Sequence, residues 1–383
     1  MKKLGLYVHI PFCVQKCAYC DFLSAPSKAA DRISYIQALK KEIKSFAAAA
    51  KDYEVDTVFF GGGTPSILEP ELIRELMECL KESFCFIKED AESKLEITLE
   101  ANPGTLTKEK LISYRKSGIN RLSMGLQSAD KEELRLLGRI HTFEQFKENY
   151  KAAREAGFEN ISVDLMSALP GQTLKSYQTT LEKVLALEPE HISAYSLIIE
   201  EGTPFYTAWE EGKLILPEEE EERQMYYLTE ELLKKAGYDR YEISNYAKKR
   251  YESRHNSKYW TGEEYLGLGL GAASYWKGSR NRNTENLADY LEKANAGESL
   301  LIESLLLTKQ EKIEEFMFLG LRRMEGVSKE VFRERFGEEL LSVYGEIIKE
   351  QETKGLIAQD EKRLWLTAQG IDLSNQVMAE YLF

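Results

Sequence analysis

The stretch YVHIPFCVQKCAYC, residues 7–20, governs the interpretation of this sequence. An apolar, strand-like segment leads directly into three cysteines with the spacing Cys-x3-Cys-x2-Cys. Three thiolates can bind three irons of a cubane cluster, which leaves the fourth iron without a protein thiolate. The sequence therefore predicts a 4Fe–4S cluster bound by Cys13, Cys17 and Cys20.

Two other chemistries compete for these cysteines. Structural zinc would need a fourth ligand, for which His9 is the nearest candidate. Cys17 and Cys20 also have the spacing of a thioredoxin-like dithiol, but that interpretation leaves Cys13 without a role. Neither alternative explains the glycine-rich GGGTPS segment, residues 61–66, that follows the next predicted strand.

The composition narrows the class of protein. The chain has 383 residues, of which 43% are hydrophobic, as in ordinary globular proteins. Lys and Arg total 51 against 64 Asp and Glu, so the net charge is −13. This acidity argues against a nucleic-acid partner, because binding to phosphates relies on clustered Lys and Arg. No apolar run approaches the roughly 18 residues that cross a bilayer, so no transmembrane segment is expected.

Cysteine usage indicates the compartment. Five cysteines are an odd number, and three of them fall within eight residues, which argues against a disulfide framework. Metal binding in a reducing compartment fits better, and we expect a cytoplasmic protein. Cys79 and Cys85 flank the end of an apolar helical pattern and are predicted to be buried small hydrophobic residues.

Strand and helix patterns alternate six times before residue 215. Repeated units of this kind predict an α/β fold with a parallel sheet, and the glycine and polar residues that follow each strand suit the carboxyl-terminal rim of a (β/α) barrel. Glu218–Glu222 are expected to begin a helix. We predict three regions: a partial barrel over 1–215, a connecting region over 216–300, and a helical, winged-helix-like domain over 301–383 whose hairpin is GLIAQDEKRLWLT.

Short motifs are spread along the chain, after successive predicted strands. They are YVHIPFC at 7–13, CAYCDF at 17–22, GGGTPS at 61–66, EANP at 100–103, SMGLQS at 123–128, Arg139, DLMSALPGQT at 164–173, EEGTP at 200–204 and GLGLGAAS at 267–274. By their order and positions they resemble the radical S-adenosylmethionine (SAM) superfamily, within it the oxygen-independent coproporphyrinogen III oxidase (HemN-like) group. The family implies a partial (β/α)6 barrel whose open iron binds SAM.

Two features favour the heme-chaperone branch of this group over its oxidases. Oxidases typically carry a further cysteine two places after the cluster motif, where this chain has Phe22. The segment HNSKYW, residues 255–260, fits an HNxxYW pattern associated with heme binding in the chaperones. The resemblance thus implies a protein that binds heme and delivers it to acceptor proteins such as respiratory cytochromes. The alternative is radical oxidative decarboxylation of coproporphyrinogen III, and the sequence leaves open whether SAM is cleaved.

The resemblance also implies roles for single residues. Tyr7 and Tyr19 would flank the cluster and SAM, and backbone groups of Gly62, Gly63 and Thr64 would meet its methionine part. Polar groups of SAM would be held by Glu100, Gln127, Arg139 and Asp164. The alternative for each polar residue is a salt bridge or turn cap at the rim.

For heme, the resemblance implies His255 as an iron ligand, with Tyr259 and Trp260 packed on the macrocycle. A spacing of four on a helix would place Tyr259 against His255. Cations suited to the heme propionates precede the motif, at Lys248, Lys249, Arg250 and Arg254. The alternative is an exposed basic loop with a structural histidine.

Overall fold

The computed structural model describes residues 1–88 and 94–382. Its centre is a 12-stranded sheet in which seven neighbouring strands run parallel. In sheet order these are β11 (Tyr265–Leu268), β1 (Lys2–Ile10), β4 (Tyr53–Gly62), β5 (Glu96–Ala101), β6 (Arg121–Gln127), β7 (Ile161–Ser167) and β8 (His191–Ser196). Six of them are the strands that the sequence predicts, which confirms the parallel α/β fold.

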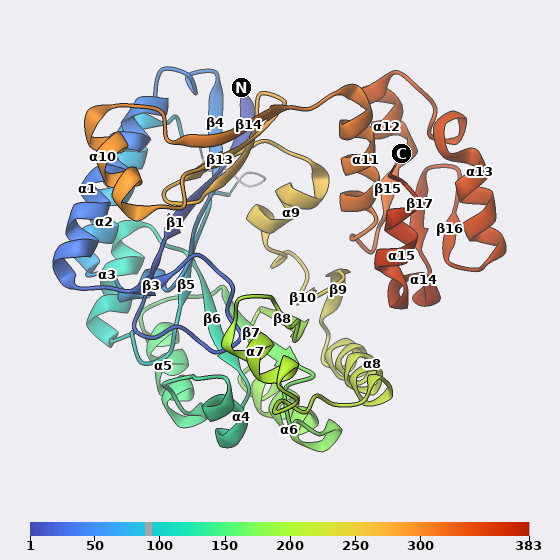
Figure 1. Cartoon of the computed structure of the whole chain (residues 1–383), viewed down its shortest axis with the longest axis horizontal. Helices are drawn as coiled ribbons and strands as arrows, with labels where there is room; N and C mark the ends of the chain where they lie inside the picture. Colours follow the sequence, from blue (N-terminus) through green and yellow to red (C-terminus); the bar gives the residue numbers. More distant parts are fainter. Residues whose placement is uncertain (89–93, 383) are drawn as a thin grey trace.

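Helices pack on the outer face of the curved sheet (Figure 1). They are α1 (Ala29–Phe46), α2 (Pro70–Ser83), α3 (Lys108–Ser117), α4 (Lys131–Leu136), α5 (Phe143–Glu155) and α6 (Leu174–Leu185). The alternation along β6 shows how the sequence separates the two faces. Leu122, Met124 and Leu126 are fully buried against the helices, whereas the intervening residues, from Arg121 to Gln127, face the interior of the curve.

Segments after residue 215 complete both edges of the sheet, and no described strand pairs one edge with the other, so the barrel is open. One edge continues from β11 through the antiparallel strands β12 (Ala273–Trp276), β13 (Ser279–Asn283) and β14 (Leu301–Leu306), with α10 (Leu287–Ala296) beside them. The other continues from β8 through β10 (Asn245–Ala247) and β9 (Asp239–Glu242), after α7 (Pro204–Glu210) and α8 (Glu219–Lys235). The predicted connecting region, residues 216–300, therefore contributes strands to both edges of the sheet.

The C-terminal part has its own hydrophobic core and a winged-helix order of elements. The order is α11 (Lys309–Gly320), β15 (Val327–Ser328), α12 (Lys329–Phe336), α13 (Leu340–Thr353), β16 (Ile357–Gln359), β17 (Arg363–Leu366), α14 (Ala368–Asp372) and α15 (Ser374–Ala379). β16 and β17 form the predicted hairpin. Two backbone hydrogen bonds join the C-terminal part to the barrel edge. The Ile243 amide donates to the Arg322 carbonyl oxygen, and the Met324 amide donates to the Tyr241 carbonyl oxygen, both at 3.1 Å.

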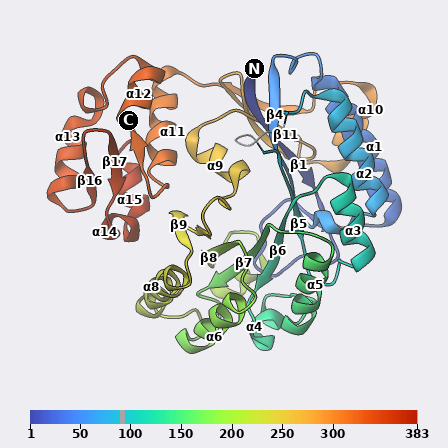
Figure 2. The ribbon, with the colours of Figure 1, turned by 180° about the vertical axis from the view of Figure 1, so that it is seen from behind.

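Helix α9 (Arg254–Thr261) carries the HNSKYW motif and lies between the sheet and the C-terminal helices in both views (Figures 1 and 2). Ser253 caps its first turn by accepting a hydrogen bond from the Asn256 amide, and Gly262 ends it in a left-handed conformation. Across residues 1–88 and 94–382, no helix has both the length and the apolar character needed to cross a membrane.

Candidate functional site

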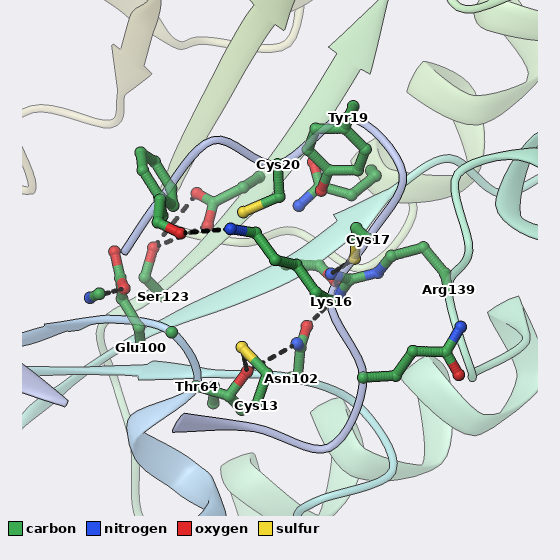
Figure 3. A pocket seen from close by; sticks show the side chains of 18 residues that line it. Cys13, Lys16, Cys17, Tyr19, Cys20, Thr64, Glu100, Asn102, Ser123 and Arg139 are labelled. Atoms are coloured by element: carbon green, nitrogen blue, oxygen red, sulfur yellow. Dashed lines mark hydrogen bonds between the residues drawn. The ribbon is translucent and has the colours of Figure 1, made fainter. Parts of the chain in front are cut away.

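The three motif cysteines line one cavity at the carboxyl ends of the strands, which we call the cluster cavity. Their loop continues from β1 through β2 (Phe12–Cys13), which pairs with β3 (Ala25–Pro26). The backbone of Ala18 fixes the loop, since it donates to Leu137 and accepts from Phe205, both at 3.0 Å. Figure 3 shows the three cysteines around the same space, together with Thr64, Glu100, Asn102, Ser123 and Arg139.

The sulfur atoms have polar neighbours suited to thiolates. Thr64 Oγ1 donates to Cys13 Sγ at 3.5 Å, and Arg139 Nη1 donates to Cys17 Sγ at 3.7 Å (Figure 3). Burial raises the pKa of the Cys20 thiol, with a smaller contribution from Cys17. A bound cation offsets such a penalty because a metal-bound thiol is deprotonated. The donor set therefore fits an iron–sulfur cluster.

His9 is occupied within the protein and is not available as a fourth ligand in this conformation. Its Nδ1 lies 3.0 Å from the Tyr7 hydroxyl, and its Nε2 lies 3.0 Å from the Leu23 carbonyl oxygen. Within the described part of the chain, no three His, Cys, Asp or Glu side chains converge on a point that could hold a single metal ion. In a cubane, by contrast, each thiolate binds a different iron.

The GGG segment is shaped by close packing at the end of β4. A Cβ on Gly61 would lie 2.9 Å from the Tyr7 ring, one on Gly62 would lie 2.5 Å from the His9 ring, and one on Gly63 would lie 2.7 Å from the Phe12 carbonyl oxygen. Gly62 also has a φ of +108°. These glycines let β4 approach the cluster loop, so protein packing alone already requires them.

Two carboxylates face the cluster cavity from neighbouring parts of the sheet. Glu100 Oε2 accepts from the Gly62 amide at 3.1 Å, and Asp164 accepts from the Ser123 hydroxyl at 3.0 Å. Burial and the charge of Asp164 raise the pKa of Glu100 to about 8, although the Gly62 hydrogen bond opposes the shift. The two are positioned to accept hydrogen bonds from a polar ligand.

Arg139 and Gln127 complete the wall of the cavity. Besides Cys17, the Arg139 guanidinium donates to Asn102 Oδ1 and to the Gly125 carbonyl oxygen, and its buried Nε has no partner. Gln127 has a φ of +70° at a bulge where β6 slips against β7. Such bulges redirect side chains and occur next to functional sites.

A second cavity of about 340 Å³ adjoins the first, and we call it the inner cavity. It shares Tyr19, Cys20, Glu100 and Asp164 with the cluster cavity and extends across β8 to Asn256 on α9. Much of its remaining wall is apolar, formed by Phe59, Met166, Tyr195, Leu197 and Ile198. It can therefore accept an apolar guest beside the cluster.

The structure brings most of the predicted SAM residues together. The cluster cavity is lined by Cys13, Cys17, Tyr19, Cys20, Gly62, Gly63, Thr64, Glu100, Gln127, Arg139 and Asp164. Tyr7 is not among them, because its ring packs on Phe59 at 6.2 Å and its hydroxyl is engaged by His9.

His255 lies behind the cavities and is fully buried. Its Nδ1 is 2.9 Å from the Thr57 hydroxyl, its Nε2 is 2.9 Å from the Tyr259 hydroxyl, and its ring stacks on Phe59. Burial lowers the pKa of His255 to about 3, with smaller effects of Lys258 and Arg121. Tyr259 packs against the histidine as predicted, but it occupies the nitrogen that an iron would need.

Several residues near the cavities were missed by the sequence interpretation or assigned differently. Asn102 links Thr64 to Arg139, and Ser123 holds Asp164. Asn102 stands inside the EANP motif and Ser123 inside SMGLQS, so the motifs contained a signal for both. Arg121 and Asn256 also line the inner cavity.

Two expectations away from the site need correction. Cys79 is buried as predicted, but Cys85 is exposed because it follows the end of α2. The cations before α9 do not line either cavity. Lys248 donates to the Glu188 carbonyl oxygen, and Arg254 pairs with Asp56 at 3.4 Å.

Comparison with known proteins finds separate family matches in the barrel and in the C-terminal part. Residues 7–184 match the radical SAM superfamily, and residues 307–373 match the HemN C-terminal domain. The heme chaperone HemW of Bacillus subtilis is 39% identical over 376 residues, which cover 98% of this chain and 98% of that protein. The chain belongs to the HemW family.

Other members and neighbours agree with this placement. A mitochondrial protein of Danio rerio, radical S-adenosyl methionine domain-containing protein 1, is 31% identical over 99% of this chain and 86% of its own length. The solved structure of Escherichia coli coproporphyrinogen III oxidase (HemN) superposes with a TM-score of 0.86 at 26% identity, covering 99% of this chain and 90% of that one. Membership of the radical SAM superfamily implies a 4Fe–4S cluster and SAM as cofactors.

Proposed function

We propose that this protein binds heme and delivers it to acceptor proteins, among them respiratory cytochromes, in the cytoplasm. The near-complete match to a heme chaperone carries the proposal. The inner cavity supports it, because it offers an apolar wall beside the cluster cavity. Phe22 occupies the position at which oxidases of the HemN-like group typically have a fourth cysteine. Its side chain lines both cavities.

We further propose that Cys13, Cys17 and Cys20 bind the cluster and that SAM binds beside it in the cluster cavity. When bound, a cluster of this kind supplies one electron that can cleave the sulfonium of SAM. The amides of Gly62, Gly63 and Thr64 are already donated to Glu100, Ile10 and Phe12. Backbone contacts to SAM at this segment would therefore be made by carbonyl oxygens, which accept from its ammonium group.

The polar side chains of the cavity suit the rest of SAM. Glu100 and Asp164 can accept from ribose hydroxyls, and Gln127 can both donate and accept. Arg139 lies against Cys17 and supplies positive charge near the thiolates. Tyr19 lines the cavity and packs on Phe205, with the two ring centroids 6.4 Å apart. Tyr7 packs against Gly61 outside the cavity, where a Cβ on Gly61 would lie 2.9 Å from the Tyr7 ring.

Ligation of heme iron by His255 stays a prediction. Both ring nitrogens are hydrogen-bonded in this conformation, so ligation would require α9 to move away from Thr57 or Tyr259 to turn. Asn256, the next residue of the motif, already lines the inner cavity. The motif can therefore contact heme through Asn256 before any such movement.

One experiment separates the chaperone from the oxidase. The protein is reconstituted with iron and sulfide without oxygen and then incubated with SAM, reductant and either heme or coproporphyrinogen III. We expect a Soret band and transfer of heme to an apo-cytochrome, with coproporphyrinogen left intact. Formation of protoporphyrinogen, together with no heme transfer, would overturn the proposal in favour of the oxidase.

A further inference from the structure

Arg121 is a buried cation in the wall of the inner cavity. It begins β6, is 2% exposed and lines the inner cavity. In the described residues, 1–88 and 94–382, its Nε is buried without a hydrogen-bond partner, and its charge opposes the rise in the pKa of Glu100 that burial and Asp164 cause. A buried guanidinium donor without an acceptor carries a desolvation cost, which a bound carboxylate would remove.

The neighbouring carboxylates are engaged elsewhere. Glu100 accepts from Gly62, and Asp164 accepts from Ser123. Glu96 accepts from the amides of Arg254 and His255 at the start of α9. Among the residues that line the inner cavity, Arg121 is the cation, and the carboxylates of Asp21, Glu100, Asp164 and Glu200 share the wall with it.

We propose that Arg121 binds a carboxylate of the guest in the inner cavity, and that this carboxylate is a propionate of the tetrapyrrole. The inference rests on the proposed function, which it extends to the recognition of one side chain of the ligand. The planar guanidinium matches a carboxylate through two parallel hydrogen bonds. The apolar wall formed by Phe59, Met166 and Leu197 receives the edge of the macrocycle.

The carboxylate of SAM is the other source of the same chemistry. In the proposed site, SAM would use that group at the open iron held by Cys13, Cys17 and Cys20 in the cluster cavity, and Arg121 does not line that cavity. The cations before α9 line neither cavity. Arg121 is thus the cation in reach of an acidic guest within the inner cavity.

The test compares heme with heme dimethyl ester, in which both propionates are uncharged, on the reconstituted protein. We expect the unaltered protein to bind heme about 10- to 100-fold more tightly than the ester, as for one charged hydrogen-bonded pair. Arg121→Met should lose this preference and keep its affinity for the ester. Arg135→Met, at an exposed position on α4, should leave the preference unchanged.

Two further measurements make the outcome decisive. The melting temperature and circular dichroism spectrum of Arg121→Met without ligand show that the variant is folded before its affinities are compared. SAM affinity should not change in that variant, and a selective loss of SAM binding would assign the carboxylate to SAM and overturn the proposal. Equal affinity of the unaltered protein for heme and its ester overturns this inference alone. No heme binding by the unaltered protein overturns the chaperone function as well.

Discussion

The hydroxyl of Thr57 lies 2.9 Å from Nδ1 of His255, although 198 positions separate the two residues in the chain. This hydrogen bond joins β4 to α9 in the buried interior of the protein. With the Tyr259 hydroxyl on Nε2, it gives the histidine a structural role in the described conformation.

His255→Ala should therefore lower the free energy of unfolding by about 2–4 kcal/mol, since it leaves a cavity and an unpaired Thr57 hydroxyl. Tyr259→Phe, which keeps the ring and removes one hydrogen bond, should cost about 1 kcal/mol. Urea denaturation measures both. Should folded His255→Ala take up heme with an unchanged Soret band, His255 is not the iron ligand.

The cysteine assignment predicts a sharp division among five variants. Alanine at Cys13, Cys17 or Cys20 should abolish the brown chromophore and reduce bound iron from about four per chain, because each thiolate binds its own iron. Alanine at Cys79 or Cys85 should leave the iron content unchanged. Iron and acid-labile sulfide are measured after reconstitution. Four irons retained in the triple variant would remove these cysteines from the cluster.

Asp164→Ala should weaken SAM binding about 10- to 100-fold, because it removes a carboxyl group that can accept hydrogen bonds in the cavity. Ser123→Ala, which only frees the carboxylate to rotate, should have a smaller effect. The cluster should assemble in both variants. Calorimetry on the reconstituted proteins measures the affinity, with exposed Asp239→Ala as the control. Unchanged affinity in Asp164→Ala would contradict the assignment.

Gly63→Ala and Gly345→Ala should have opposite effects. A Cβ at Gly63 would collide with the Phe12 backbone, which cannot move without displacing the cluster loop. We expect this variant to lose more than about 1 kcal/mol of stability, as in overpacked cores, and to bind less iron. Gly345 lies within α13 with open space around it, so alanine there should stabilise by about 0.5–1 kcal/mol. Thermal unfolding compares the pair.

Glu42 should make stability depend on pH. This buried carboxylate on α1 accepts from Tyr290 at 2.6 Å, Asn283 at 2.7 Å and Gly269 at 2.8 Å, yet burial raises its pKa to about 7. Between the pKa of Glu42 in the unfolded chain and pH 7, Glu42 is protonated in the folded state and ionised in the unfolded state. The free energy of unfolding therefore falls as pH rises through this window, with a slope approaching about 1.4 kcal/mol per pH unit.

Glu42→Gln should remove that contribution. The free energy of unfolding of the unaltered protein minus that of the variant, which we call the stability gap, should therefore decrease from pH 5 to pH 7. Denaturant titrations at several pH values measure the gap. Glu148→Gln, at an exposed position, serves as the control. If this difference stays constant or increases with pH, Glu42 is ionised throughout this range.

The alternation of strand and helix patterns was sufficient to predict the parallel sheet, because buried strands and amphipathic helices differ in their periodicity. The strand β11 was not predicted, since its glycine-rich sequence resembles a loop. It forms because Gly267 fits against Ala273, where a Cβ would lie 2.1 Å from the carbonyl oxygen. Such a strand depends on its neighbours and cannot be recognised from local propensity.

The residues around the cluster could be anticipated because each motif follows a strand and the strand ends meet at one rim. Orientation could not be read in the same way. His255 and Asn256 are adjacent on a helix, so their side chains diverge by roughly 100°, and only Asn256 reaches the inner cavity. Arg121 begins a strand outside any recognised signature, and the missing partner of its Nε is a property of the folded interior alone.

Helix α9 is shared between two bodies of the protein. Toward the sheet, Lys258 pairs with buried Asp56 at 3.0 Å. Toward the C-terminal domain, Arg322 stacks on the Trp260 ring at 4.5 Å, and Arg335 donates to the Thr261 carbonyl oxygen at 2.8 Å. Any guest that displaces α9 must also break contacts with the C-terminal domain, so the free energies of the two events are reciprocally linked. Movement of α9 in the barrel interior would therefore change the packing of Arg322 and Arg335 in the C-terminal domain.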